Sequence, residues 1–395
     1  MNLADKETIK GLCRKYGLKP SKEAGQNFLV DDSVLQKIVE AADLKRDDVV
    51  LEVGPGFGVL TRELASRVKK VVAVELEKRV IKILRKNLEG VENVEIIQED
   101  ILKLISNFQF PIVKNITKVV ANLPYGITSR FLRGMLERSV GEDTNRQQGM
   151  LEGDKTDRVD KTDKSNKTGQ TPPNPPLSKG GKYGMPLTLL VQKEVAERVC
   201  AGPGKLSLLA VSVQFYAEPK IEFYVNKNSF WPEPEVMSAV ISIRPRGKYL
   251  ERLGFVGQET NKQHADKTDK SDKTDRSYKT DRTDKTDRSY KTDRTDKTDK
   301  SDKTDRTDKT DKTDKTDIIN EFFRIARIGF SARRKQLQNN LAAGLRVDNE
   351  EVKKILREVG LREDIRAQDL SVENWIELVA KVERWPTLAR RSFGG

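Results

Sequence analysis

The tetrapeptide Asn122-Leu123-Pro124-Tyr125 follows an apolar run, Lys118 to Ala121, of the kind that forms a buried strand. The Asn122 side-chain oxygen and the backbone carbonyl of Leu123 or Pro124 could accept the two hydrogens of an amino group on a nucleic-acid base. Tyr125 could stack on the same base, an interaction worth about 1–3 kcal/mol. The alternative is an ordinary turn between a strand and a helix, where Asn and Pro are common.

An amine attached to a base is a poor nucleophile, because its lone pair is delocalised into the ring. Two acceptors on the amine would turn that lone pair toward an electrophile such as a methyl group on a cationic sulfur. Positioning two reactants in this way can supply about 7–11 kcal/mol. The single histidine, His264, lies in a polar low-complexity stretch, so chemistry that needs no imidazole base is favoured.

A second group of candidate residues begins at a glycine-rich turn. Val49 to Val53 reads as a buried strand, and it is followed at alternate positions by Gly54, Gly56 and Gly58. Glycine in such a turn lets the backbone approach a ligand closely. Val59 stands where a dinucleotide-binding fingerprint has its third glycine, so the turn resembles the first motif of S-adenosylmethionine (AdoMet) methyltransferases more than an NAD site. A tight turn without a ligand is the alternative.

Two acidic residues follow later strands in the same way. Glu75 ends the apolar run 71–74 and lies 21 positions after Gly54, the distance expected for the next parallel strand of a βαβ unit. A carboxylate there can accept hydrogen bonds from both hydroxyls of a ribose. Asp100 follows the expected strand 94–97, where it could meet an adenine amino group. For each acid, a solvated carboxylate at a strand end is the alternative.

Strands and helices alternate through this part of the chain, which predicts a doubly wound parallel sheet. We expect strands at 49–53, 71–75, 94–97, 118–121, 187–191, 221–225 and 236–243. We expect helices at 33–42, 58–67, 79–88, 128–138, 193–199 and 206–216. Ligands of such sheets bind at the carboxyl ends of the strands, which is where the pattern places Gly54, Glu75, Asp100 and Asn122.

Two low-complexity stretches interrupt this pattern, at residues 141–184 and in the triplet tract Lys267 to Asp317. The tract repeats Lys/Arg-Thr/Ser-Asp every three residues, a period that suits neither a strand nor an amphipathic helix. It has almost no apolar side chains, so we expect it to stay disordered. The expected organisation is an AdoMet-binding methyltransferase domain at 1–245 that contains the 141–184 insertion, a disordered linker at 246–317, and a helical RNA-binding domain at 318–395.

The C-terminal domain is expected to consist of helices from Ile318 onward. A third helix should begin near Asp348, with Glu351 completing a capping box, and a fourth should begin at Ser371. A basic cluster in this domain could contact RNA phosphates or could form a solvated helix face. Its members are Arg324, Arg327, Arg333, Arg334 and Lys335.

Composition limits the remaining possibilities. The net charge of +13 favours a polyanionic partner, with nucleic acid the leading candidate. The chain has no run of about 18 apolar residues that would span a membrane. Cys13 and Cys200 have no metal-ligand spacing, so we expect free thiols in a reducing cytoplasm and no metal site. We also expect a monomer.

Six stretches occur in an order that resembles the small-subunit ribosomal RNA adenine dimethyltransferase family. They cover residues 25–29, 51–56, 122–125, 192–198, 230–236 and 330–341. The resemblance implies a Rossmann-like AdoMet-dependent methyltransferase domain followed by a small helical domain. It also implies the transfer of four methyl groups in all, two to each of two adjacent adenosines near the 3′ end of the RNA, on the immature small ribosomal subunit.

The resemblance implies roles for individual residues as well. AdoMet would contact Asn27, Leu29, Gly54, Glu75, Asp100 and Asn122. The adenine would be held by Asn122, Leu123, Pro124 and Tyr125, with Phe230 on its other face. The chain departs from the family pattern at Gly126, where Asn is common, and at Glu99, where Gly is frequent.

Two other functions stay open on the sequence. One is that of the related family that dimethylates an adenine of large-subunit RNA and confers antibiotic resistance. The other is that of an RNA-binding assembly or transcription factor that keeps the fold without catalysis. The C-terminal match and the Phe-x-Pro-x-Pro-x-Val stretch at 230–236 favour the small-subunit enzyme, and Glu75 together with Asn122 favours a catalyst.

Overall fold

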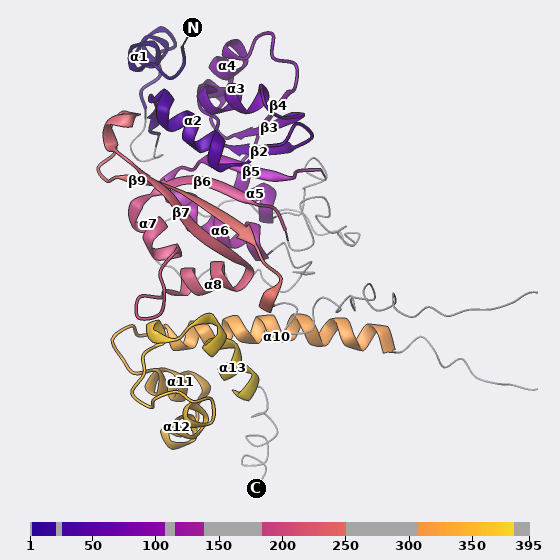
Figure 1. Cartoon of the computed structure of the whole chain (residues 1–395), viewed down its shortest axis with the longest axis vertical. Helices are drawn as coiled ribbons and strands as arrows, with labels where there is room; N and C mark the ends of the chain where they lie inside the picture. Colours follow the sequence, from indigo (N-terminus) through magenta and orange to yellow (C-terminus); the bar gives the residue numbers. More distant parts are fainter. Residues whose placement is uncertain (1, 21–25, 107–114, 138–183, 250–306, 383–395) are drawn as a thin grey trace, which may run out of the picture.

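The computed structural model describes residues 2–20, 26–106, 115–137, 184–249 and 307–382. Its centre is a seven-stranded sheet in the order β4-β3-β2-β5-β6-β9-β7 (Figure 1). The strands are β2 (Val49–Val53), β3 (Lys70–Glu75), β4 (Val94–Gln98), β5 (Lys118–Asn122), β6 (Leu187–Gln192), β7 (Ala217–Val225) and β9 (Ser238–Pro245). The Rossmann-like sheet predicted from the sequence is confirmed.

The sheet is mixed rather than fully parallel. β2 to β6 are parallel to one another, but β9 lies between β6 and β7 and is antiparallel to both. A short connection explains the difference, because residues 226–237 return the chain directly beside β7 without a crossover helix. The parallel part nevertheless puts the carboxyl ends of β2, β3, β4, β5 and β6 at one edge.

Helices cover both faces of the sheet (Figure 1). Val50 and Val120 face a core with α1 (Lys6–Lys15), α2 (Asp32–Ala41), α3 (Val59–Ala65) and α4 (Lys78–Asn87). Their neighbours Leu51 and Val119 face the other core, with α5 (Ile101–Ser106), α6 (Thr128–Glu137), α7 (Lys193–Val199) and α8 (Leu208–Tyr216). This alternation follows from the two-residue period of a strand. None of the helices in the described part of the chain is both long and apolar enough to cross a membrane.

A small second sheet joins the N-terminal segment to the segment before β9. β1 (Phe28–Leu29) pairs antiparallel with β8 (Phe230–Trp231), so that Leu29 lies opposite Phe230. The Ser229 hydroxyl donates a hydrogen bond to Asp31 at 2.8 Å, next to this pair. Residues about 200 positions apart in the sequence are therefore held side by side.

The C-terminal helices pack against the sheet domain through aromatic rings. They are α10 (Thr307–Gly329), α11 (Leu337–Leu345), α12 (Asn349–Glu358) and α13 (Val372–Val382). Phe322 and Phe323 on α10 contact Phe215 on α8, with ring centroids 4.4 and 5.4 Å apart. Backbone NH groups of Gly204 and Leu206 both donate to the carbonyl of Gln368, at 2.9 and 3.2 Å. The two regions thus share one continuous core.

Two local expectations for the C-terminal region need correction. α10 begins at Thr307, so the last triplets of the repeat tract are helical rather than disordered. Extending an existing helix costs little once the packed segment around Phe322 has formed its nucleus. Asp348 does cap α12, but its carboxylate accepts from the backbone NH of Glu350, and Glu351 does not complete a capping box. The expected helix start at Ser371 is confirmed by its hydrogen bonds with Asn374.

Some expectations fall on residues outside the described ranges. They concern Gly25, His264, most of the 141–184 insertion and the tract from 267 to 306. The described residues show where the 141–184 insertion and the triplet tract adjoin the sheet domain. Leu187 lies at the amino end of β6 and pairs with Ile243 near the carboxyl end of β9. Both attachment points therefore lie at the sheet edge opposite the carboxyl ends of the parallel strands.

The aromatic contact predicts that Phe322→Ala destabilises the protein. The ring is 1% exposed, and truncation of a buried Phe costs about 3–5 kcal/mol of unfolding free energy. Denaturant unfolding of the full chain should show this loss. Tyr224→Ala is the matched control, because that ring is 49% exposed and its removal should cost less than about 1 kcal/mol. Equal losses in the two variants would contradict the proposed packing.

Candidate functional site

The glycine turn after β2 adopts a backbone that only glycine takes up easily. Gly54 and Gly56 have φ angles of +66° and +58°, in the left-handed region that penalises a Cβ atom. A Cβ on Gly54 would lie 3.6 Å from Cδ of Pro124, and a Cβ on Gly56 would lie 3.2 Å from the ring of Phe28. The turn is therefore packed directly against the tetrapeptide that follows β5.

Glu75 at the end of β3 joins this turn. Its carboxylate accepts hydrogen bonds from the backbone NH groups of Gly56 at 3.4 Å and Glu77 at 2.9 Å. Burial raises the pKa of Glu75, and these backbone donors oppose that effect. Leu76, the next residue, is 66% exposed although it is a large apolar side chain. The Glu75 carboxylate, a hydrogen-bond acceptor, thus lies next to the exposed apolar side chain of Leu76 at the end of β3.

Asp100 lies at the end of the next strand but has a structural role as well. Its Oδ1 accepts from the backbone NH of Leu102 at 2.8 Å, which caps α5. Its other oxygen makes no hydrogen bond within the described part of the chain. The preceding residue, Glu99, donates its backbone NH to the carbonyl of Glu75 at 3.2 Å. Asp100 therefore lies one strand away from Glu75, with one oxygen left to accept.

The Asn122 side chain is oriented by a hydrogen bond that it donates to a distant segment. Its Nδ2 donates to the backbone carbonyl of Asn27 at 3.1 Å. Since the nitrogen is engaged, Oδ1 is the end of the amide that stays available, and no donor among the described residues reaches it. The amide is half-buried. This arrangement leaves Asn122 ready to accept a hydrogen bond from a ligand.

The two neighbouring backbone carbonyls differ in their hydrogen bonds. The Pro124 carbonyl accepts from the backbone NH of Ile127 at 3.2 Å and from the Thr128 hydroxyl at 3.4 Å. The Leu123 carbonyl accepts from none of the residues that the structure describes, although its NH donates to Leu190 at 3.1 Å. Of the two carbonyls that the sequence left open, Leu123 is the one free to accept from a ligand amine.

Tyr125 follows in a single 3₁₀ turn, residues 125–127. Its hydroxyl is 2.9 Å from the Ser238 hydroxyl at the start of β9. Burial raises the pKa of Tyr125, and the Ser238 bond opposes that rise, so the hydroxyl stays protonated at neutral pH. The ring is half-buried, which leaves part of its surface open.

Two residues named from the resemblance occupy core positions instead. Phe230 is fully buried and Leu29 is 5% exposed, and they pair with each other across β1 and β8. In this conformation Phe230 offers no face to a base, because its ring packs into the core formed with α1 to α4. A stacking role for Phe230 stays a prediction that requires the ring to move.

Three residues near this edge were not assigned roles from the sequence. Ser238 and Leu76 carry no motif signal by themselves. Glu52 could have been noticed as an acid inside an apolar strand: it is 1% exposed, and its Oε2 makes no hydrogen bond among the described residues. Burial raises the pKa of Glu52 to about 8. No cluster of three or more potential metal ligands occurs in the described ranges.

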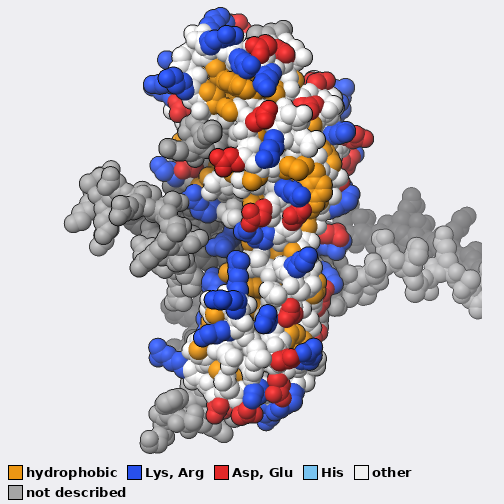
Figure 2. Space-filling model, turned by 90° about the vertical axis from the view of Figure 1, so that its left-hand side faces the viewer, with side chains coloured by type: hydrophobic (Ala, Val, Ile, Leu, Met, Phe, Trp, Pro, Cys, Tyr) orange, Lys and Arg blue, Asp and Glu red, His pale blue; other side chains and the backbone are white. Residues whose placement is uncertain are grey.

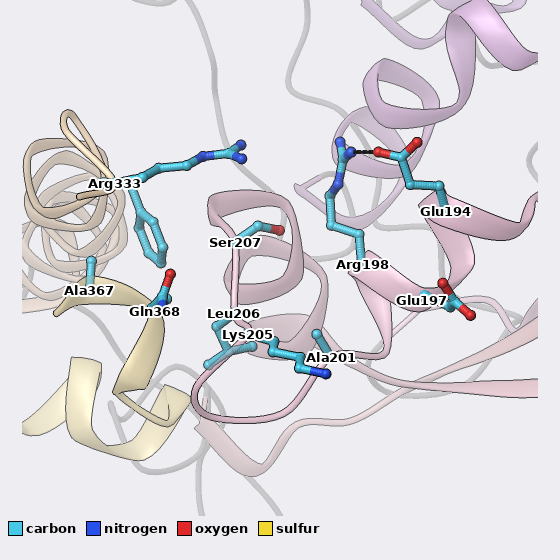
Figure 3. Close-up of a pocket in the computed structure, with 11 residues that line it drawn as sticks. Glu194, Glu197, Arg198, Ala201, Lys205, Leu206, Ser207, Arg333, Ala367 and Gln368 are labelled. Carbon is cyan, nitrogen blue, oxygen red and sulfur yellow. Dashed lines mark hydrogen bonds and ion pairs between the residues drawn. The ribbon is translucent and has the colours of Figure 1, made fainter.

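The predicted basic cluster is exposed throughout, but its members differ in their partners. Arg324 forms an ion pair with Glu321, with Nε 2.6 Å from the carboxylate. Arg333 instead lines a cavity of about 310 Å³ between α7, α8 and the C-terminal helices (Figure 3). Lys and Arg side chains gather on this side of the molecule, where the sheet domain meets those helices (Figure 2).

Only some of the charged side chains that line this cavity form ion pairs with described residues. Glu194 is hydrogen-bonded to Arg198, and Glu197 lies 3.8 Å from Lys193. Figure 3 shows the Arg333 side chain extending toward this Arg198–Glu194 pair. Arg333 and Lys205 line the cavity without an ion pair to any described residue, so the cavity suits an anion.

Comparison with known proteins gives a consistent result. Residues 17–254 match the family model described as ribosomal RNA adenine dimethylase. The ribosomal RNA small subunit methyltransferase A of Dehalococcoides mccartyi (strain BAV1) is 30% identical over 375 residues, which cover 94% of this chain and 90% of the relative. The protein of the same name from Crocosphaera subtropica is 30% identical over 365 residues, covering 91% and 97%.

Two solved structures share the fold. A dimethyladenosine transferase from Plasmodium falciparum superimposes with a TM-score of 0.53 at 19% identity, covering 90% of this chain and 96% of that one. The 23S rRNA methyltransferase ErmE gives a TM-score of 0.50 at 20% identity, covering 90% and 100%. At these identities the likeness concerns the fold alone.

The buried Glu52 predicts a pH dependence of stability. Its folded-state pKa of about 8 lies above the usual value of 4.5, so the stability that the bound proton supplies is complete below pH 4.5 and is lost as the pH rises to 8. In Glu52→Gln this loss should disappear. Urea unfolding without AdoMet should show a smaller fall between pH 5 and 8 for the variant than for wild type. Glu99→Gln, at an exposed site, is the control, and parallel profiles for Glu52→Gln and wild type would contradict the assignment.

Proposed function

Because the chain belongs to the ribosomal RNA adenine dimethylase family, and is therefore an rRNA adenine methyltransferase, we propose that it dimethylates two adjacent adenosines near the 3′ end of small-subunit ribosomal RNA. The substrate would be the immature small ribosomal subunit in the cytoplasm, and the chain would act as a monomer. The observation that carries the proposal is the Asn122 amide, which is held by the Asn27 carbonyl with its oxygen left to accept.

Asn122 and Leu123 would orient the target amine. The Asn122 side-chain oxygen and the Leu123 carbonyl each accept one hydrogen of the adenine amino group, so that the nitrogen lone pair points away from both. Tyr125 stacks on the base at about 1–3 kcal/mol. When AdoMet is bound, the oriented lone pair would face the methyl group on its cationic sulfur, and the amine proton would leave to water after transfer. No strong base is needed.

The residues at the strand ends fit AdoMet. Gly54 leaves room for a close backbone approach, Glu75 offers a carboxylate for ribose hydroxyls, and Leu76 offers an exposed apolar surface next to it. Asp100 retains one carboxylate oxygen for an adenine amino group. AdoMet, when bound, supplies a methyl group on a cationic sulfur. Asn27 and Leu29 would contribute backbone contacts, because the Leu29 side chain is in the core.

The cavity at the junction of the two regions would hold the RNA backbone. α7 begins directly after β6, at the strand-end edge, and Glu194 and Arg198 on this helix both line the cavity. Arg333 and Lys205 supply cations there that form no ion pair with a described residue. In the proposed domain division, with a catalytic part to residue 245 and an RNA-binding part from 318, the two parts would share this cavity.

A first test replaces the orienting amide. In Asn122→Ala the adenine amine loses one of its two acceptors, so methyl transfer should fall by about 100-fold or more, the scale for removal of one orienting polar group. RNA affinity, measured by filter binding, should stay near wild type because the phosphate contacts are unchanged. Wild-type methyl transfer by the variant would count against the mechanism.

A second experiment identifies the substrate. Labelled AdoMet is offered with unmethylated small ribosomal subunits and, separately, with large-subunit RNA, and the product is analysed for dimethyladenosine. The proposal requires label in the small subunit. Label only in large-subunit RNA would favour the antibiotic-resistance type of enzyme, and RNA binding without label in either would favour a non-catalytic assembly or transcription factor.

A third test concerns the cavity. Arg333→Ala and Lys205→Ala should each weaken RNA binding and lower the slope of log affinity against log salt concentration by about 0.7–0.9, the amount expected for one lost phosphate contact. The matched control is Arg362→Ala, an exposed arginine outside the cavity that pairs with Asp364. An equal change in the control would mean that only overall charge matters.

A further inference from the structure

Tyr125 lies in a short turn whose backbone is held by a hydrogen bond from Ile127 to the Pro124 carbonyl, but one side of the turn is unpacked. It is the first residue of a one-turn 3₁₀ helix, and the next residue is Gly126, which is exposed. A Cβ built on Gly126 would meet nothing within 4 Å, so the turn is not packed on that side. Backbone geometry alone therefore does little to fix the plane of the Tyr125 ring.

Ser238 lies on one of the most rigid parts of the fold. It begins β9 and is paired on both sides, with Gln192 of β6 and with Val225 of β7. The preceding carbonyl, of Met237, accepts the backbone NH of Lys193 at 2.9 Å. The Ser238 side chain is fully buried. A group attached here has a fixed position relative to the carboxyl ends of the strands.

We propose that Ser238 is a positioning residue, which holds the ring of Tyr125 in the orientation that stacks on the target adenine. The two hydroxyl oxygens are 2.9 Å apart, although the residues are 113 positions apart in the sequence. Stacking uses the face of the ring and not its hydroxyl, so the hydroxyl is free to serve as the anchor. This inference rests on the proposed function, since it assigns how that site orders its base-binding ring.

The hydrogen bond between Tyr125 and Ser238 links the part of the proposed site that would bind the base to the central sheet. Asn122 is held from one direction by the Asn27 carbonyl, and Tyr125 is held from another by Ser238. Both bonds leave the group that meets the base open: the Asn122 oxygen in one case and the ring face in the other. A site assembled before the base arrives loses less conformational entropy on binding and keeps reacting groups aligned.

The experiment combines substitutions at the two ends of the bond. Ser238→Ala and Tyr125→Phe should each lower kcat for methyl transfer about fivefold, the effect of one neutral hydrogen bond. KM for AdoMet should not change. The double variant should be no slower than either single variant, because both remove the same interaction.

A size control separates hydrogen bonding from packing. Ser238→Cys keeps a side chain of similar size but has a weak hydrogen-bonding group, so it should behave like Ser238→Ala. Wild-type kcat in Ser238→Cys together with a low value in Ser238→Ala would assign the effect to packing and overturn the inference. An effect of Ser238→Ala that persists undiminished in the Tyr125→Phe background would overturn it as well, as would wild-type kcat in Ser238→Ala.

Failure of this inference is distinguishable from failure of the proposed function. Absence of methyl transfer in the wild-type protein contradicts the function itself. Wild-type activity that is indifferent to Ser238→Ala contradicts only the positioning role. Thermal unfolding of each variant is measured alongside, so that a change in kcat is compared with any change in Tm.

Discussion

The close approach of Gly54 to Pro124 is the constraint on which the rest of the site depends. β2 and β5 are neighbours in the sheet, and the first residue after β2 has a left-handed backbone, with φ +66°, that favours glycine. Any larger residue at Gly54 would need a left-handed backbone and would have its Cβ at van der Waals contact with the proline ring. The residues proposed to bind the cofactor and those proposed to bind the base meet at this contact.

Much of this edge could be predicted from the sequence. Three of the parallel strands read as short apolar runs that lead to a residue of a distinctive type: Gly54, Glu75 or Asn122. Because parallel strands end at one edge, the pattern alone was enough to bring those side chains together. The resemblance to the adenine dimethyltransferase family, found from motifs in order, is confirmed by the comparisons.

Contacts between distant segments could not be predicted. Asn122 is oriented by a carbonyl 95 positions away, and Tyr125 meets a serine 113 positions away; neither bond leaves a periodic signal. Phe230 shows that a sequence motif does not reveal whether its side chain is buried. The family resemblance implied that Phe230 stacks on the base, but β8 pairs with β1 and the ring is buried in the core, so that role stays a prediction. Local turn geometry also decided that the Pro124 carbonyl is occupied while that of Leu123 is not.

The place where a low-complexity stretch joins the protein decides which part of the fold a change in its length would disturb. Leu187 and Ile243, which mark the two attachment points, lie across from each other at the amino end of β6. A change in the length of either stretch would therefore enter at the edge of the sheet opposite the proposed site, and the carboxyl ends of the parallel strands could keep their positions.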